Sequence, residues 1–334
     1  MLTPGQTLSL TIERPAVGGR MIARVGGQII LVAGAIPGER VSARIERVSK
    51  AVAYADTLSA EEPSADRCLP FTDPLCGGCL YAHIAYPRQL EIKSLVIAHA
   101  LARIGHVTVP APVEVASSPR DGYRMRARLH VRGSRLGFFR EGTHEVCDAR
   151  ATRQLLPATC DALDGLAAAL GGHHLDAVRA VEVSENMSSS ERVVHLDVSP
   201  GTDVRALESL TSMSGVAGLT VAVSTGGGVR VLAGTAYVSD ALTIGDLPPL
   251  NIRRHVLSFF QGNRYLLQGL VAHVIEQVPP SSALLQPEER DVLGDAGRSR
   301  LRELVRPAGR GVEQAPLLGD RPALERACAP EARE

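Results

Sequence analysis

The stretch Cys68-Leu-Pro-Phe-Thr-Asp-Pro-Leu-Cys76-Gly-Gly-Cys79 places three of the chain's six cysteines within twelve residues. A fourth cysteine, Cys147, lies well downstream. Thiolates packed this closely repel one another unless a cation shares them, so the spacing indicates a metal centre. Gly77-Gly78 allows the backbone to turn tightly enough for Cys76 and Cys79 to reach one ion or cluster.

The spacing leaves the identity of the metal open. Three clustered cysteines with one distant cysteine suit tetrahedral zinc and equally suit a [4Fe–4S] cluster. A disulfide is the weaker interpretation, because the N-terminal residues lack the basic and apolar segments of an export signal. For the same reason we expect a cytoplasmic protein.

The composition restricts the classes of function. The 334 residues have room for two or three domains. No apolar run approaches the length of a membrane span, so no membrane association is expected. The 36 basic residues equal the 36 acidic ones, so the net charge is zero and any nucleic-acid site must be a local patch.

Residues 1–59 predict a small all-β domain. Short β-type runs separated by Gly and Pro fit a five-stranded barrel of the oligonucleotide-binding kind. Its arginines form either a basic rim for a nucleic-acid backbone or ordinary solvated strand edges, and both interpretations stay open. The predicted strands are Leu8–Ile12, Arg20–Val25, Gln28–Val32, Glu39–Val48 and Val52–Leu58, and the arginines are Arg20, Arg24, Arg40, Arg44 and Arg47.

A strictly alternating stretch, Tyr123–Arg132, is the second informative segment. One face carries apolar side chains, and the other carries Arg124, Arg126, Arg128, His130 and Arg132. Such alternation predicts a half-buried strand with a cationic face. Like charges on one face repel, and a polyanion would remove that cost, so we favour RNA or DNA binding over a plain solvated face.

The remaining periodicity predicts helices and further strands. His195 lies on one of these strands, and we expect it to face solvent. The predicted helices are Tyr86–Ile104, Leu155–Leu170 and Asn263–Val278; a hairpin is expected at 136–147, and strands at Val181–Ser184, Arg192–Val198, Gly218–Ser224 and Val229–Leu232.

The cysteine loop, the basic strand and Ser258-Phe-Phe-Gln-Gly-Asn263 together resemble the bacterial S-adenosylmethionine-dependent RNA (uracil-5-)-methyltransferase family. The resemblance runs over residues 1–293. It implies an α+β multidomain fold: a five-stranded OB-like (TRAM) β-barrel at 1–59, a central α+β domain with a Cys-ligated cluster at 60–250, and a Rossmann-like methyltransferase domain from 251. Further matching stretches are Gly18–Arg24, Gly34–Val41 and Leu136–Glu145.

The resemblance also implies residue roles. Cys68, Cys76, Cys79 and Cys147 would hold a [4Fe–4S] cluster, with Cys160 the alternative fourth ligand. The family usually has five residues between its first two cysteines, and this chain has seven. Gln261 matches a residue that contacts S-adenosylmethionine.

The implied reaction is methylation of uracil C5 in rRNA or tRNA. A cysteine thiolate adds to C6 of a flipped-out uracil, C5 takes the methyl group, and a base removes the C5 proton. RNA is therefore the expected partner, and we expect a monomer.

The chain departs from the family pattern beyond about residue 293. Gly294 and Gly297 do not form the expected Gly-rich cofactor turn, and Cys328 is a poor match for the nucleophile. We therefore expect an incomplete Rossmann-like domain with an aberrant tail from about 294, no assignable catalytic residue and impaired activity. The alternative is a non-catalytic RNA-binding iron–sulfur or zinc protein.

Overall fold

The computed structural model describes residues 2–277 except 134, 206, 208, 209, 211–213, 224–227 and 246–247, and only the backbone of 172–175. The expectations about the tail from 294, the Gly-rich turn and Cys328 lie outside the described residues. Mixed α/β architecture is confirmed, with two large sheets, a hairpin and three helices in the described part. None of those helices has the length and apolarity that a membrane crossing requires.

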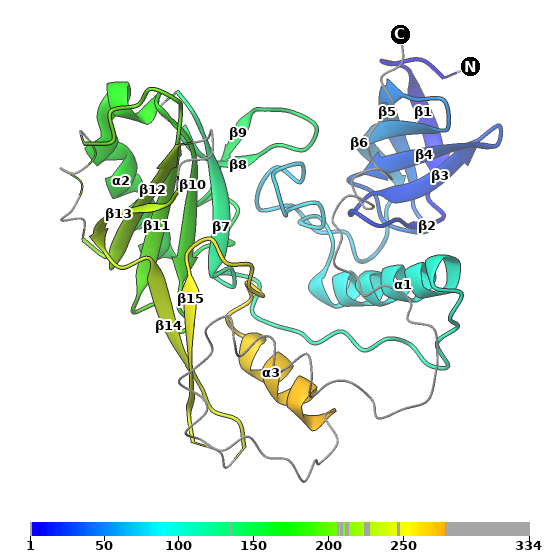
Figure 1. The fold of residues 1–334 in the computed structure, drawn as a ribbon. Coiled ribbons are helices and arrows are strands. Elements are labelled where there is room, and N and C mark those ends of the chain that lie inside the picture. Colours follow the sequence, from blue (N-terminus) through cyan, green and yellow to red (C-terminus); the bar gives the residue numbers. More distant parts are fainter. Residues whose placement is uncertain are drawn as a thin grey trace, which may run out of the picture. The chain divides into compact units, whose positions relative to one another are not determined.

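The N-terminal sheet has six strands where five were predicted (Figure 1). The additional strand is the two-residue β2, which contains Pro15 and lies at the edge of the sheet, where a missing backbone N–H is tolerated. Strands β1 and β2 are the two edge strands of this sheet, and within residues 2–62, all of which are described, they do not pair with each other. Closure of the sheet into a barrel therefore stays a prediction. In sheet order the strands are β1 (Thr7–Thr11), β5 (Arg40–Val48), β6 (Val52–Glu62), β4 (Gln28–Ala33), β3 (Met21–Val25) and β2 (Arg14–Pro15).

Helix α1 spans Tyr86–Ile104, as predicted. Pro87 lies in its first turn, where the missing N–H costs no hydrogen bond. Ile92 is fully buried in the same apolar cluster as the first sheet. The expected cap Gly105 is right-handed, and the next residue, His106, takes the positive φ of 52° instead.

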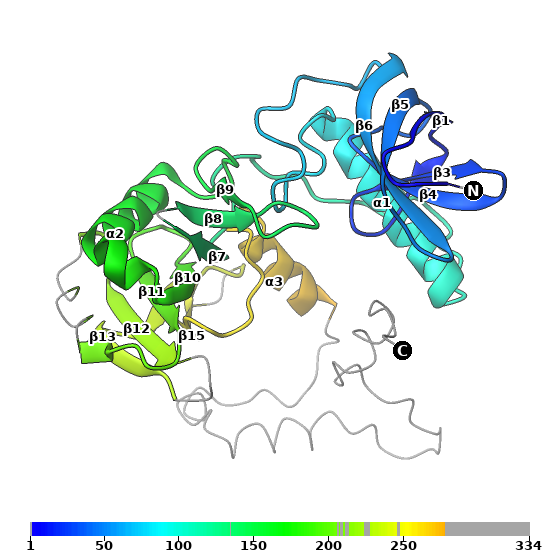
Figure 2. The same ribbon diagram turned by 90° about the horizontal axis from the view of Figure 1, so that it is seen from above.

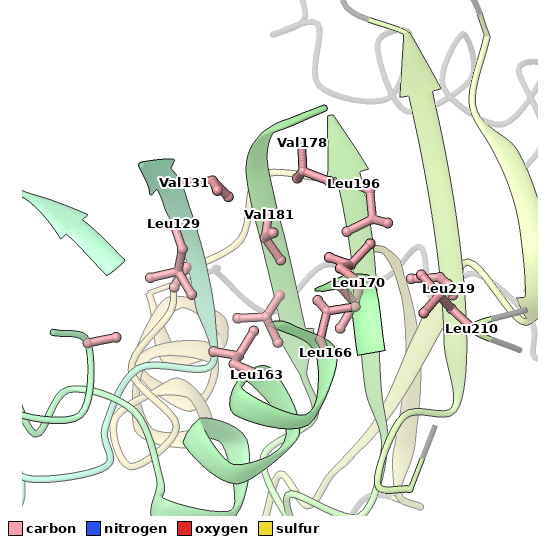
Figure 3. Packing of buried hydrophobic residues seen from close by; sticks show 14 of the residues in the cluster. Leu129, Val131, Leu163, Leu166, Leu170, Val178, Val181, Leu196, Leu210 and Leu219 are labelled. Carbon is pink, nitrogen blue, oxygen red and sulfur yellow. The ribbon is translucent and has the colours of Figure 1, made fainter. Parts of the chain in front are cut away.

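The second sheet has seven strands and contains all of the strands predicted after residue 120. Helix α2 (Pro157–Leu175) covers one face, and its Leu163, Leu166 and Leu170 pack on Leu129 and Leu196 from the sheet (Figure 3). The predicted alternation of the basic strand is confirmed, because Ala127, Leu129 and Val131 point into this core. In sheet order the strands are β13 (Arg230–Gly234), β12 (Gly218–Val223), β11 (Arg192–Val198), β10 (Val178–Glu185), β7 (Arg126–Arg132), β8 (Arg135–Phe139) and β9 (Val146–Asp148).

A separate hairpin, β14 (Tyr237–Leu242) and β15 (Leu250–His255), was not predicted (Figure 1; β15 is also labelled in Figure 2). Its Val238 packs with Val193 of β11 and with Val256. The domain boundary that we expected after residue 250 coincides with the start of β15. The domain division stays a prediction.

Helix α3 spans Leu267–Glu276, which is shorter than the predicted Asn263–Val278. The first residues of the predicted helix form a turn, because Asn263 Oδ1 accepts a hydrogen bond from the Tyr265 N–H at 3.0 Å. Val278 lies outside the described residues.

His195 does not face solvent as expected. It is 3 % exposed, and its Nδ1 lies 2.8 Å from Thr220 Oγ1. Burial lowers its pKa, so the ring stays neutral at pH 7. The prediction was wrong because strand alternation cannot show that the second face of a sheet is also covered.

A buried ion cluster joins the seven-stranded sheet to the segment that precedes α3. Glu185, at the end of β10, pairs with both Arg192 and Arg264 and accepts a hydrogen bond from Thr159 Oγ1 at 2.8 Å. All four side chains are buried. Removing the carboxylate would leave two buried guanidinium groups without their counter-charge.

The Glu185→Ala variant should therefore lose about 3–5 kcal/mol of unfolding free energy, measured by urea denaturation. The control is Arg44→Ala, which removes an exposed pair with Glu46 and should cost less than about 1 kcal/mol. Equal stability of the two variants would contradict a structural role for the cluster.

Candidate cysteine centre and nucleic-acid interface

The cysteine turn is held by backbone pairing with the end of β8. Gly77 N–H donates to Phe139 O at 3.0 Å, and Glu141 N–H donates to Leu75 O at 2.7 Å. Cys76 therefore forms an isolated antiparallel bridge with Arg140. This pairing fixes the turn on the seven-stranded sheet.

A side chain would be unfavourable at both glycines of the turn, through a tight backbone contact at Gly77 and through the backbone conformation at Gly78. A Cβ at Gly77 would lie 3.1 Å from Phe139 O, and Gly78 has a positive φ of 85°. A Cβ at Gly78 would also lie 2.7 Å from Gln154 Oε1. The Cys79 N–H donates to Cys76 O at 2.9 Å, which closes the turn that the sequence predicted.

The predicted hairpin at 136–147 brings Cys147 back to this turn. Strands β8 and β9 pair with Cys147 opposite Phe138, one residue before the Phe139 carbonyl that holds Gly77. Cys76 and Cys147 are joined as a disulfide, which the sequence analysis had disfavoured. Cys79 is buried in the same small cluster, so three of the four predicted ligands lie together.

The fourth predicted ligand, Cys68, is exposed and contacts Ala82 and His83, which follow the cysteine turn. Its N–H donates to His83 O at 2.9 Å, and its Sγ lies 3.7 Å from Ala82 O. The alternative ligand, Cys160, is buried elsewhere, in the core between α2 and the sheet. The structure thus groups Cys147, and not Cys160, with the turn.

The sulfur atoms of Cys76, Cys79 and Cys147 are donors of the type that zinc and iron–sulfur centres use, but in this structure they are not arranged around a metal site. Burial raises the pKa of the Cys79 thiol to about 11, and the positive charge of Arg124 acts against this rise. Gln154 Nε2 lies 3.8 Å from Cys79 Sγ and donates to Gly77 O at 2.7 Å. In the disulfide form, no group of three or more His, Cys, Asp or Glu side chains within the described residues is arranged to hold a metal ion.

The cationic face of β7 is partly neutralised inside the protein. Arg126 and Arg128 both pair with Glu182 on β10, at 2.5 and 2.8 Å, and Arg128 also pairs with Asp197 at 3.0 Å. The expectation that this face needs a polyanion to relieve repulsion is therefore wrong for these two arginines. Glu182 lies directly opposite Arg128 in the sheet register.

Arg124 and Arg132 remain without an ion pair among the described residues. The Arg132 guanidinium lies 5.4 Å from the Phe139 ring centroid, and His130 stacks on the same ring at 3.6 Å. The Arg124 Nε is buried without a hydrogen-bond partner in the described part of the chain. Burial and the neighbouring arginines lower the pKa of His130, so its ring adds no positive charge at pH 7.

The possible basic rim of the N-terminal sheet is also largely paired. Arg20, Arg24, Arg40 and Arg44 each contact at least one carboxylate, whereas the Arg47 guanidinium lies 4.0 Å from the Tyr54 ring centroid. Self-pairing of this kind favours solvated strand edges for Arg24, Arg40 and Arg44, whereas the Arg20 side chain is only 12% exposed and bonds Asp56 and Glu141 within the protein.

Gln261, the predicted cofactor contact, is exposed in the segment before α3. This segment pairs with the start of the basic stretch: Met125 N–H donates to Gly262 O at 2.7 Å, and Arg264 N–H donates to Tyr123 O at 2.9 Å. These bonds explain why β7 begins at Arg126 and not at the predicted Tyr123.

Sequence reasoning did not identify two residues that contact the predicted site residues. Gln154 contacts the cysteine turn from a loop 75 residues beyond Cys79, and Glu182 neutralises the basic strand from β10. Neither residue lies in a recognisable motif. Only the alternation of β10 could have placed Glu182 on the same face as the arginines.

The chain is similar to several known proteins. Residues 2–58 match the TRAM domain family. An uncharacterized RNA methyltransferase of Corynebacterium efficiens is 35% identical over 169 residues, which are 49% of this chain and 40% of that protein. The 23S rRNA (uracil(1939)-C(5))-methyltransferase of Halomonas elongata is 36% identical over 157 residues, covering 45% of this chain and 32% of that enzyme.

Among solved structures, a Pyrococcus abyssi tRNA (uracil-54, C5)-methyltransferase in complex with S-adenosyl-L-homocysteine has a similar fold. The TM-score is 0.59 at 22% sequence identity, over 81% of this chain and 65% of that one. The matched segment spans only about a third to two fifths of the length of the curated relatives.

The position of Cys147 can be tested through Gly137 on β8. A Cβ there would lie 1.7 Å from Cys147 O, so Gly137→Ala must separate β8 from β9. We expect less Cys76–Cys147 disulfide after mild oxidation, measured by mass spectrometry, and a loss of about 1–3 kcal/mol of stability.

The matched control is Gly165→Ala in α2, where an added Cβ meets nothing within 4 Å. This variant should form the disulfide normally. Normal disulfide formation in Gly137→Ala would show that the β8–β9 pairing does not deliver Cys147.

Proposed function

We propose that this chain, which is related to the RNA (uracil-5-)-methyltransferase family, forms the RNA-binding and cysteine-centre part of such an enzyme. Its substrate would be a uracil in rRNA or tRNA, and S-adenosylmethionine would supply the methyl group. Gln261 is the proposed cofactor contact. No residue of the described part is assigned as the nucleophile or the base.

The main support is the extent of the sequence similarity. The TRAM match ends at residue 58, whereas the alignments with RNA methyltransferases extend over 157–169 residues. The similarity to these relatives therefore extends beyond the TRAM domain, an RNA-binding module that many proteins could carry. That additional similarity favours a methyltransferase over an unrelated TRAM protein.

We assign Cys68, Cys76, Cys79 and Cys147 as the ligands of one inorganic centre, in a [4Fe–4S] cluster. Cys76, Cys79 and Cys147 already lie together, and Cys68 lies within 3.7 Å of the Ala82 carbonyl, three residues after Cys79. Two-electron reduction of the disulfide by an external thiol, which is itself oxidised to a disulfide, would provide the two further thiolates. Four soft sulfur donors would also suit zinc, so metal analysis is needed to identify the ion.

RNA binding is assigned to the exposed face of β7 and the residues that precede it. Arg124 and Arg132 are the primary candidates, because their guanidinium groups have no ion pair in the described part of the chain. Arg126 and Arg128 would contribute less, since Glu182 and Asp197 already neutralise them. The protein would act as a monomer in the cytoplasm.

Titration of a fluorescent single-stranded oligoribonucleotide at several salt concentrations tests the RNA assignment. One lost phosphate contact in Arg132→Gln should reduce the slope of log K against log salt by about 0.7. Arg126→Gln should change the slope less, and Arg103→Gln, on α1, should leave it unchanged. If the unaltered chain fails to bind the oligonucleotide, the proposed function is wrong.

Anaerobic analysis of iron, sulfide and zinc tests the ligand set. A cluster would give a brown protein with broad absorption near about 400 nm, and zinc would give a colourless one. Cys147→Ser should lower the metal content, whereas the buried core variant Cys160→Ser should retain it. The reverse result would make Cys160 the fourth ligand.

A further inference from the structure

A cavity of about 390 Å³ lies directly beside the cysteine turn. Four of the chain's eleven aromatic residues line it: Phe71, Tyr81, Tyr86 and Tyr123. Its volume is within the range of sites that hold small organic groups, roughly 300–1,000 Å³. In a protein with only 3% aromatic residues, this concentration of rings distinguishes the cavity from the rest of the described surface.

Two unpaired cations lie at the same cavity. Lys93 of α1 and Arg120 both line it and are both exposed. Neither forms an ion pair with any described residue, although Arg126, Arg128 and Arg140 nearby in sequence are paired. Aromatic faces next to free cations are the combination by which proteins bind unpaired nucleotides, with bases on the rings and phosphates on the cations.

The polar groups of the cavity wall are mostly engaged within the protein. Gln89 Nε2 donates to Tyr81 O and Ile84 O at 3.0 and 2.9 Å, and Gln154 Nε2 donates to Gly77 O at 2.7 Å. Tyr123 OH donates to Gln154 Oε1 at 3.2 Å. These bonds hold the cavity wall in place but leave few donors for hydrogen bonds to the edge of a bound base. Binding of a base would therefore depend on stacking, and different bases would be accepted.

We propose that this cavity holds one unstacked base of single-stranded RNA, with Lys93 and Arg120 binding the flanking phosphates. The proposal rests on the proposed function, since it assumes that the chain binds RNA. It adds a second contact region, beside the cysteine turn, to the arginine face of β7. The base would lie next to Cys79 and Gln154, which also line the cavity.

The chain contains only two lysines, Lys50 and Lys93, both exposed, so amine acetylation of the full chain provides an internal control. With saturating single-stranded oligoribonucleotide, mass spectrometry should show Lys93 acetylation reduced at least about fivefold. A blunt RNA duplex of the same sequence should not protect Lys93, because its bases are already paired. Saturated single-strand binding that leaves Lys93 fully reactive would overturn the proposal while leaving the proposed function intact.

The aromatic contribution is tested with Phe71→Leu, which removes a stacking surface and no hydrogen bond that the structure shows. Affinity for the single strand should fall about tenfold, in line with the effect of removing a stacking ring. The matched control is Leu69→Ala in the same loop, a 93% exposed residue outside the cavity. Absorption near 400 nm or zinc content should be the same in both variants, which shows that the cysteine loop is intact.

Equal affinity of Phe71→Leu and Leu69→Ala would reject the cavity as a base site. Failure of the unaltered chain to bind any single strand would instead reject the proposed function, and the cavity proposal with it. Discrimination between purine and pyrimidine oligonucleotides by more than about tenfold would contradict recognition by stacking alone.

Discussion

The backbone pairing between the cysteine turn and the end of β8 is the constraint on which the candidate site depends. Two hydrogen bonds, from Gly77 to Phe139 and from Glu141 to Leu75, join a loop near residue 76 to a hairpin near residue 140. The same hairpin carries Cys147 on its second strand. Because β8 is also a strand of the seven-stranded sheet, the cysteine turn and Cys147 are both positioned by that sheet.

A second constraint is the placement of charge on that sheet. Arg126 and Arg128 would repel each other on one strand face, and Glu182 on the neighbouring strand pairs with both. The basic strand is therefore stable without a ligand. Among the described residues, Arg124 and Arg132 in the basic stretch and Lys93 and Arg120 at the aromatic cavity form no ion pair, so their charge can bind a polyanion.

Local patterns predicted most of the elements that build the site. The alternation of Tyr123–Arg132 gave the correct buried face, and the helical periodicity of Tyr86–Ile104 gave the correct bounds. Predictions failed where the decisive contact came from a distant segment. His195 is buried although its strand alternates, and Tyr123–Met125 leave the predicted strand because they pair with residues 262–264.

The sequence by itself indicated the cysteine turn, because two glycines between two cysteines allow a tight bend, and it determined the apolar face of the basic strand through its period of two. Which distant cysteine joins the turn was decided only by the tertiary structure, since Cys160 stayed an alternative to Cys147 until strand pairing placed Cys147 beside the turn and Cys160 in the core. The partners of the arginines were decided in the same way. Side-chain type and spacing along a chain specify local geometry, whereas the neighbours of a residue across a sheet depend on register and strand order, which no short segment encodes.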